Sequence, residues 1–281
     1  MQTLTMPTPR TTHTVKGGGG VDIAVQEWGN PEGHPIIFIH ALMQSHLGYL
    51  PILKGPLEQE ARLITFDTRG HGDSGKPENM AAYQDGEQLA DDLAAVIGLV
   101  EDAKPIVVAW SIGGVILDDY LAKYGDDGIS GAVYLGAGHA LGEGANKYVA
   151  AGFAQTAPAV ISPNLATRVR GTIEVGRANT AQPLPDDRFM LDIAVSMVVP
   201  PQARAGLISR SVNHIIDTLP STTVPMRFLH GSEDQIVELV SSKDAAAAAP
   251  NGTYVEIADI GHAPATEATE SVVKAIRSIM A

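Results

Sequence analysis

A serine, an aspartate and a histidine occur where they could form a catalytic triad. Ser111 lies in the segment AWSIG (109–113), directly after an apolar run and directly before a helical pattern. A serine at such a strand-to-helix turn has a strained backbone, and its hydroxyl projects from the sheet beside the positive end of the helix. Ala109 and Gly113, two positions on either side, are small enough to permit this turn.

A serine hydroxyl becomes a nucleophile when a base takes its proton, and the base needs an anion to orient it. Asp234 follows an expected strand at 224–230, and His262 follows the next one, at 253–257. The chain order Ser, Asp, His is typical of one particular fold. Glu233 and Asp259 are alternative acids. However, consecutive residues rarely both face one histidine, and Asp259 lies at a strand end.

Alternating apolar runs and helical patterns predict the elements that position these residues. Strands are expected at 21–28, 35–40, 62–67, 105–110, 131–135, 224–230 and 253–257, and helices at 83–100, 112–123, 237–248 and 267–280. Several strands are apolar on both faces, which is typical of a parallel sheet covered by helices on both sides. The predicted fold class is therefore α/β, a mostly parallel sheet flanked by helices with right-handed crossovers.

Residues 139–223 depart from this alternation because they contain no clear strand. A structureless loop of this length is improbable in a compact domain. Pieces such as 146–154 and 189–198 have helical patterns, so we expect an inserted helical cap over the carboxyl ends of the strands, where such sheets bind ligands. The predicted domains are a core of residues 1–138 and 224–281 and a cap of 139–223. Phe189, Met190 and Met197 are its first candidates for an acyl pocket, and the alternative for each is to pack in the core of the cap itself.

Four separated motifs together resemble the α/β-hydrolase superfamily, over about residues 11–281. They are His40-Ala41 after the strand at 35–40, the loop DTRGHGDSG at 67–75, the turn around Ser111, and Gly261-His262. Each motif alone is weak, but four in order at suitable spacing are specific. In some members of this family the acid follows the preceding strand of the sheet. Here that position, 136–139, holds no carboxylate.

The resemblance implies a role for each site residue. Ser111 would attack an acyl carbon, His262 would act as base and then as acid, and Asp234 would orient the imidazole. The backbone N–H groups of Leu42 and Ile112 would form an oxyanion hole. The chain has Ala41 where the family usually has glycine, and a methyl group there would narrow the hole or tilt the Leu42 amide.

Composition and spacing exclude several other functions. The 32 acidic and 19 basic residues give a net charge of −13, which argues against a nucleic-acid partner. The absence of cysteine excludes disulfides, thiol nucleophiles and thiolate metal sites, and no two histidines have metal-ligand spacing. We therefore expect no cofactor and no metal.

Two glycine-rich segments could suggest a phosphate loop. Residues 70–76 fit part of two nucleotide-binding patterns, but Pro77 replaces the Mg²⁺-binding hydroxyl and no helix begins there. We interpret this segment as a turn-rich loop braced by Arg69 and Asp73. Residues 17–20 lead into another strand, so they are interpreted as a hairpin turn.

No apolar run is long enough for a signal peptide or a membrane span, so we expect a cytoplasmic protein without a membrane partner. The sequence leaves the oligomeric state open.

His40 is expected to support the oxyanion loop. His139 would lie either on the surface or in the pocket, and Trp110 would either shape the acyl pocket or pack beneath the turn at Ser111.

The leading hypothesis is a serine hydrolase, a carboxylesterase or lactonase, that forms an acyl-enzyme on Ser111. A serine nucleophile distinguishes it from the epoxide hydrolases and haloalkane dehalogenases that it resembles, which use aspartate at this position. Aromatic residues make up only 5% of the chain, which favours small to medium, mainly aliphatic esters as the small-molecule partner. Three alternatives remain: a cofactor-free perhydrolase or haloperoxidase, a C–C hydrolase, and a non-enzymatic ligand-binding regulator with a vestigial triad.

Overall fold

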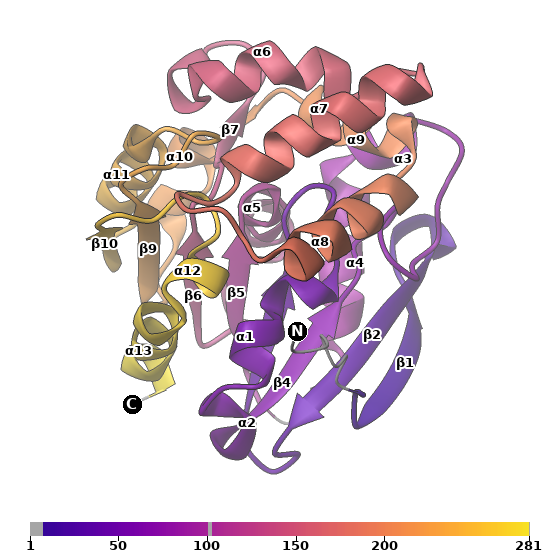
Figure 1. Cartoon of the computed structure of the whole chain (residues 1–281). Helices are drawn as coiled ribbons and strands as arrows, with labels where there is room; N and C mark the ends of the chain where they lie inside the picture. Colours follow the sequence, from indigo (N-terminus) through magenta and orange to yellow (C-terminus); the bar gives the residue numbers. More distant parts are fainter. Residues whose placement is uncertain (1–7, 101–102, 281) are drawn as a thin grey trace.

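The computed structural model describes residues 8–100 and 103–280, which form an eight-stranded sheet with helices on both faces (Figure 1). The strand order is β1-β2-β4-β3-β5-β6-β9-β10. The strands are β1 Thr11–Lys16, β2 Asp22–Gly29, β3 His34–Ile39, β4 Ala61–Phe66, β5 Ile106–Trp110, β6 Gly131–Leu135, β9 Met226–Gly231 and β10 Gly252–Ile257. From β4 to β10 every neighbouring pair is parallel, whereas β2 pairs antiparallel with β1 and β4. The predicted α/β fold class is confirmed.

The helices of the core cover both faces of the sheet because the central strands are buried on both. These helices are α1 Leu50–Leu53, α2 Leu57–Glu60, α3 Ala81–Gln84, α4 Gly86–Ile97, α5 Ile112–Tyr124, α11 Leu239–Ala248, α12 Pro264–Glu267 and α13 Thr269–Met280. One apolar cluster joins Ile37 and Ile39 of β3 to α4, α5 and α11. A second joins Ile36 and Phe38, on the opposite face of the same strand, to α1, α2 and α13.

All seven expected strands are present, with ends that differ by no more than two residues, but β1 was not expected. Its residues alternate between exposed and half-buried at the sheet edge, so the sequence has no apolar run there. The helix expected at 83–100 is two helices, because the Asp85 side chain caps α4 by accepting hydrogen bonds from the backbone N–H groups of Glu87 and Gln88.

Residues 139–223, hereafter the cap segment, are mainly helical. They form α6 Ala151–Val160, α7 Leu165–Ala178, α8 Asp186–Val198, α9 Pro201–Ile208 and α10 His214–Asp217, and α6, α7 and α8 lie together above the sheet in Figure 1. The expectation of no strand here was wrong, because β7 Ala140–Leu141 pairs antiparallel with β8 Val212–Asn213. None of the helices in residues 8–100 and 103–280 is long and apolar enough to span a bilayer.

The glycine-rich segment at 17–20 is the turn between β1 and β2, as expected. It lies so close to α4 that a Cβ atom on Gly18 would be 2.5 Å from the backbone oxygen of Gln88. Arg69 is fully buried and pairs with Asp92 of α4 at 2.6 Å, and it also donates to the backbone oxygen of Gly18. Arg69 therefore braces this region.

The loop at 70–76 is braced by a different carboxylate from the one expected. The Asp73 side chain is exposed, and its backbone N–H donates to Asp67 Oδ2 at 3.0 Å. Asp67 is fully buried and also accepts hydrogen bonds from the backbone N–H and the ring Nδ1 of His46. The expected role of Asp73 was wrong because the sequence does not reveal which aspartate faces inward.

The buried Arg69–Asp92 pair allows a prediction about stability. We expect Arg69→Met to lower the free energy of unfolding by about 3–5 kcal/mol, because Asp92 would keep a buried charge without its partner. Arg277→Met, which breaks the exposed pair with Glu60, is the matched control and should change stability very little. Urea unfolding of both variants measures this difference. Equal effects would contradict a bracing role for Arg69.

Candidate active site

Ser111 lies at a tight turn between β5 and α5. Its φ of 57° and ψ of −120° are unfavourable for a residue with a side chain, as the sequence predicted. A Cβ atom on Gly113 would be 2.8 Å from the backbone oxygen of Ile39, so a larger residue would not fit there. The backbone N–H of Ser111 donates to the oxygen of Leu135, and its own oxygen accepts from Gly114. These contacts hold the serine at the carboxyl end of β5.

Asp234 and His262 form a hydrogen-bonded pair. His262 Nδ1 lies 2.7 Å from Asp234 Oδ2, and the Asp234 side chain is fully buried. Asp234 Oδ1 accepts from the backbone N–H groups of Ile236 and Val237, and His230 Nε2 lies 3.0 Å from Oδ2. Burial alone would raise the pKa of Asp234, but His262 and His230 outweigh it and hold the pKa well below its usual range. The carboxylate is therefore ionised.

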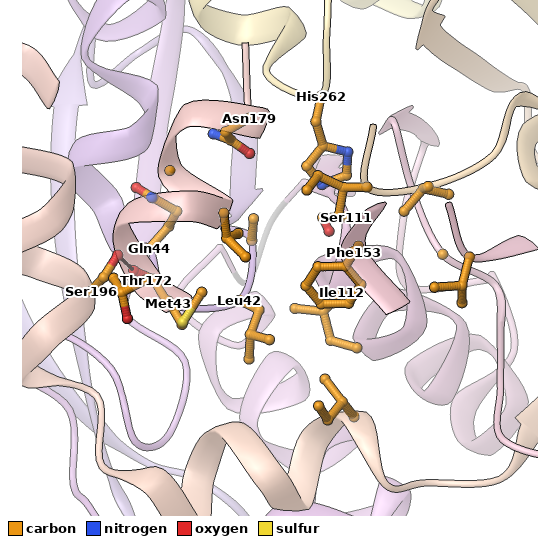
Figure 2. A pocket seen from close by; sticks show the side chains of 18 of the residues that line it. Leu42, Met43, Gln44, Ser111, Ile112, Phe153, Thr172, Asn179, Ser196 and His262 are labelled. Atoms are coloured by element: carbon orange, nitrogen blue, oxygen red, sulfur yellow. Dashed lines mark hydrogen bonds between the residues drawn. The ribbon is translucent and has the colours of Figure 1, made fainter. Parts of the chain in front are cut away.

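His262 and Ser111 line the same pocket (Figure 2). The backbone of His262 is fixed on both sides: its N–H donates to the oxygen of Asn179 at 3.0 Å, and its oxygen accepts from Trp110 Nε1 at 2.6 Å. Trp110 is buried and does not line this pocket. Of the two expected positions for Trp110, the one beneath the turn is therefore correct.

The alternative acids do not approach the histidine. Glu233 and Asp259 are both exposed, and Asp259 has a positive φ and donates its backbone N–H to Ser232 Oγ. The position after β6 does lie close to the pair: a Cβ atom on Gly136 would be 3.0 Å from Asp234 Oδ2. The chain thus has its carboxylate after β9, and the glycine after β6 leaves room for it.

Two buried histidines hold the expected oxyanion loop, residues 40–44. His40 Nδ1 donates to the backbone oxygen of Ala41 at 2.8 Å, and His71 Nε2 accepts from the backbone N–H of Met43 at 3.2 Å. Burial lowers the pKa of His40, and burial together with the neighbouring His40 lowers the pKa of His71 to about 3. Both rings are therefore neutral, and His40 supports the loop as the sequence predicted.

This arrangement leaves Leu42 between two fixed residues. Neither its backbone N–H nor that of Ile112 has a partner within the part of the chain that the structure describes, and both residues line the pocket. Both N–H groups are thus available to a substrate oxygen. Ala41 does not have a positive φ, so its backbone needs no glycine; the left-handed residue of the loop is Met43, with a φ of 61°.

The cap segment supplies much of the pocket wall. Its contributions include Phe153 of α6, Val175 of α7, Ile193 of α8 and Ile208 of α9. Of the two positions expected for Phe189, Met190 and Met197, the acyl pocket is not the correct one, because none of the three lines this pocket. Phe189 packs instead against α7, within 3.1 Å of where a Cβ atom on Gly176 would lie, and Met190 is 58% exposed.

His139 is neither on the surface nor in the pocket. It is fully buried, and its Nδ1 lies 2.7 Å from Asp118 Oδ2. Within residues 8–100 and 103–280 no group of three or more His, Cys, Asp or Glu residues is arranged so that it could hold a metal ion.

Glu267 connects the loop that carries His262 to the cap segment. Its Oε1 accepts from the backbone N–H of Ala181 at 2.7 Å, and its Oε2 accepts from that of Gly261 at 2.9 Å. Burial raises the pKa of this carboxyl, although these hydrogen bonds oppose the shift. The sequence reasoning missed Glu267, although a carboxylate five residues after the candidate histidine could have indicated it.

Comparison with known proteins identifies the family. The chain matches the family model described as the alpha/beta hydrolase fold over residues 34–268, which is most of its length. The protein belongs to the α/β-hydrolase fold family, and the resemblance drawn from the four motifs is confirmed. Membership of this family supports a hydrolase activity.

Individual relatives agree with this assignment. A solved structure of a candidate aryl esterase from Burkholderia cenocepacia has 35% identity and a TM-score of 0.90, over 96% of this chain and 99% of that one. The bifunctional esterase/perhydrolase DCH of Acinetobacter calcoaceticus is 24% identical over 91% of this chain and 94% of its own length. Other similar proteins include an esterase, lactonases and haloperoxidases.

One curated relative is much longer than this protein. The chain spans one fifth of the length of EphD from Mycobacterium tuberculosis, named a probable oxidoreductase. The two are 34% identical over 122 residues, which are 42% of this chain and 20% of that protein. The shared part is thus a segment of each protein.

The lowered pKa of Asp234 leads to a prediction about pH. Because its pKa lies well below the usual range, Asp234 should stay ionised down to about pH 4, so its protonation should not contribute to a loss of activity above that pH. We expect log kcat/KM for an ester to fall with a slope of no more than about one as the pH decreases from about 6 to 4.5, because Asp234 does not add a second protonation in this range. The stability that Asp234 contributes is present above about pH 4 and is lost only below it, so circular dichroism should show a folded protein throughout. A slope of two would contradict the ionised state of Asp234.

A second prediction concerns Glu267. We expect Glu267→Ala to lower kcat by about tenfold, because two backbone N–H groups beside the His262 loop lose their acceptor and a small displacement of the base is costly. Glu270→Ala, an exposed carboxylate on α13, is the matched control. Steady-state kinetics with melting temperatures would test this prediction. Equal kcat values for the two variants would contradict it.

Proposed function

We propose that this protein is a serine hydrolase that cleaves carboxylic esters, including lactones, through an acyl-enzyme on Ser111. The observation that carries the proposal is the shared pocket of Ser111 and His262, with His262 bonded to the buried, ionised Asp234. The similarity to the candidate aryl esterase over nearly the whole chain supports the same activity. The mostly apolar cap side chains at the pocket favour aliphatic esters.

The proposed mechanism follows from which atoms can donate a proton. An ionised carboxylate can only accept, so the proton of the neutral His262 ring lies on Nδ1, and Nε2 is the base. His262 Nε2 takes the proton of Ser111 as Oγ attacks the acyl carbon. The carbonyl oxygen becomes an oxyanion, which the N–H groups of Leu42 and Ile112 bind beside the positive end of α5.

The second half of the reaction uses the same groups. His262 Nε2 returns the proton to the leaving alkoxide, so that the alcohol departs and the acyl group stays on Ser111. Water then gives a proton to His262 and attacks the acyl carbon, and the acid leaves as Ser111 regains its proton. Each step leaves Asp234 ionised. The cap segment, residues 139–223, acts in this proposal as a lid that excludes bulk water and shapes the acyl site.

A perhydrolase is the second candidate. The similarity to the bifunctional esterase/perhydrolase DCH over nearly the full length of both proteins favours it. The acyl-enzyme would be the same, and hydrogen peroxide would replace water as the acceptor, giving a peracid. The partition between acid and peracid at a fixed peroxide concentration measures which acceptor the site prefers.

The proposed nucleophile is tested by substitution. We expect Ser111→Ala to lower kcat for p-nitrophenyl butyrate by roughly a thousandfold or more, without a loss of folding. A serine-directed phosphonate should label only Ser111 in the wild type, as identified by mass spectrometry. Ser278→Ala, an exposed serine on α13, is the matched control and should retain full activity. Activity that survives in the Ser111 variant would refute the proposal.

A further inference from the structure

The pocket that contains Ser111 has one polar side. We propose that this side is a subsite for the alcohol part of the substrate, and that it binds a neutral hydrogen-bond donor there, a hydroxyl or an amide N–H. The inference rests on the proposed esterase function and adds a substrate class to it. We assign to it three polar residues that line the pocket and come from different parts of the chain: Gln44 of the oxyanion loop, Asn179 after α7, and Asp192 of α8.

Gln44 provides the first observation. It is only 8% exposed, it lines the pocket, and its side-chain amide has no hydrogen-bond partner among residues 8–100 and 103–280. The amide is not one of the fully enclosed unpaired polar atoms of the described residues, so it is accessible from the pocket. An unpaired amide that faces a pocket is therefore suited to a ligand that carries its own donor and acceptor.

Asp192 provides the second observation, independent of the first. It is 8% exposed, its Oδ1 accepts from Arg188 Nε at 3.1 Å, and no hydrogen bond to Oδ2 exists among the described residues. Because Arg188 already neutralises the carboxylate, the site favours a neutral group over an ammonium ion. A carboxylate oxygen can only accept, so the ligand group must be a donor.

Asn179 indicates which half of the ester lies here. Its backbone oxygen accepts the backbone N–H of His262, so it lies on the side of the residue that protonates the leaving group in the proposed mechanism. In Figure 2, Gln44 and Asn179 lie on one side of the pocket, and Phe153 and Ile112 lie on the other. The polar side therefore suits the alcohol, and the apolar side suits the acyl chain.

Two esters of equal size test this inference. Pentyl butyrate and 4-hydroxybutyl butyrate differ only in a terminal methyl or hydroxyl group on the alcohol. We expect wild-type kcat/KM to be higher for the hydroxyl ester, and Asn179→Leu to reduce the ratio of the two values by about tenfold. Asp192→Asn should reduce this ratio as well, because it replaces one acceptor oxygen by a donor. Phe153→Leu, on the apolar side, is the matched control and should change both values by the same factor.

The outcomes separate this inference from the proposed function. A wild-type preference that decreases in Asn179→Leu and Asp192→Asn supports the subsite. A wild type that hydrolyses both esters without preferring the hydroxyl one, or a ratio that is the same in all variants, overturns the subsite but leaves the esterase proposal intact. A wild type that hydrolyses neither of these two esters nor p-nitrophenyl butyrate overturns the esterase proposal itself.

Discussion

The arrangement of the candidate active site depends on one buried charge, the carboxylate of Asp234. A charge without solvent is stable only if surrounding donors replace the lost water. Two backbone N–H groups, at Ile236 and Val237, and two imidazoles, at His230 and His262, approach its oxygens. This requirement explains why α11 begins only at Leu239, after the chain has turned around the carboxylate.

The cap segment takes part in the geometry of the site as well as in its walls. It holds the backbone of His262 through Asn179, and Ser196 Oγ of α8 donates to the backbone oxygen of Met43 in the oxyanion loop. Within the segment, the fully buried Arg204 donates to backbone oxygens of Val160 and Ser196, at the ends of α6 and α8. A guanidinium there satisfies carbonyl groups that helix ends leave unpaired. The positions of the His262 backbone and of the oxyanion loop therefore depend on how the cap segment is folded.

The sequence predicted those features that depend on local pattern, and it missed those that depend on partners distant in the chain. Apolar runs located seven strands of the eight-stranded sheet, and the short segment around Ser111 was sufficient to predict a strained turn. In contrast, Glu267 acts through the backbone N–H of Ala181, 86 residues away in the chain, and its spacing from His262 does not reveal that partner. The sequence left two positions open for Phe189, because helical periodicity shows that a face is apolar, but not whether that face packs on α7 or lines a pocket.

The structure also explains why alanine at position 41, where the family usually has glycine, is compatible with the fold. The groups available to a substrate oxygen are backbone N–H groups, and the buried, neutral His40 and His71 fix the residues on either side of Leu42. The conformational strain of the loop is at Met43. A methyl group at position 41 therefore costs no backbone strain, and the side chains of this loop can vary while the N–H groups stay in place. The side chains around the pocket differ in polarity: Gln44, two residues after Leu42, is polar and Phe153 is not.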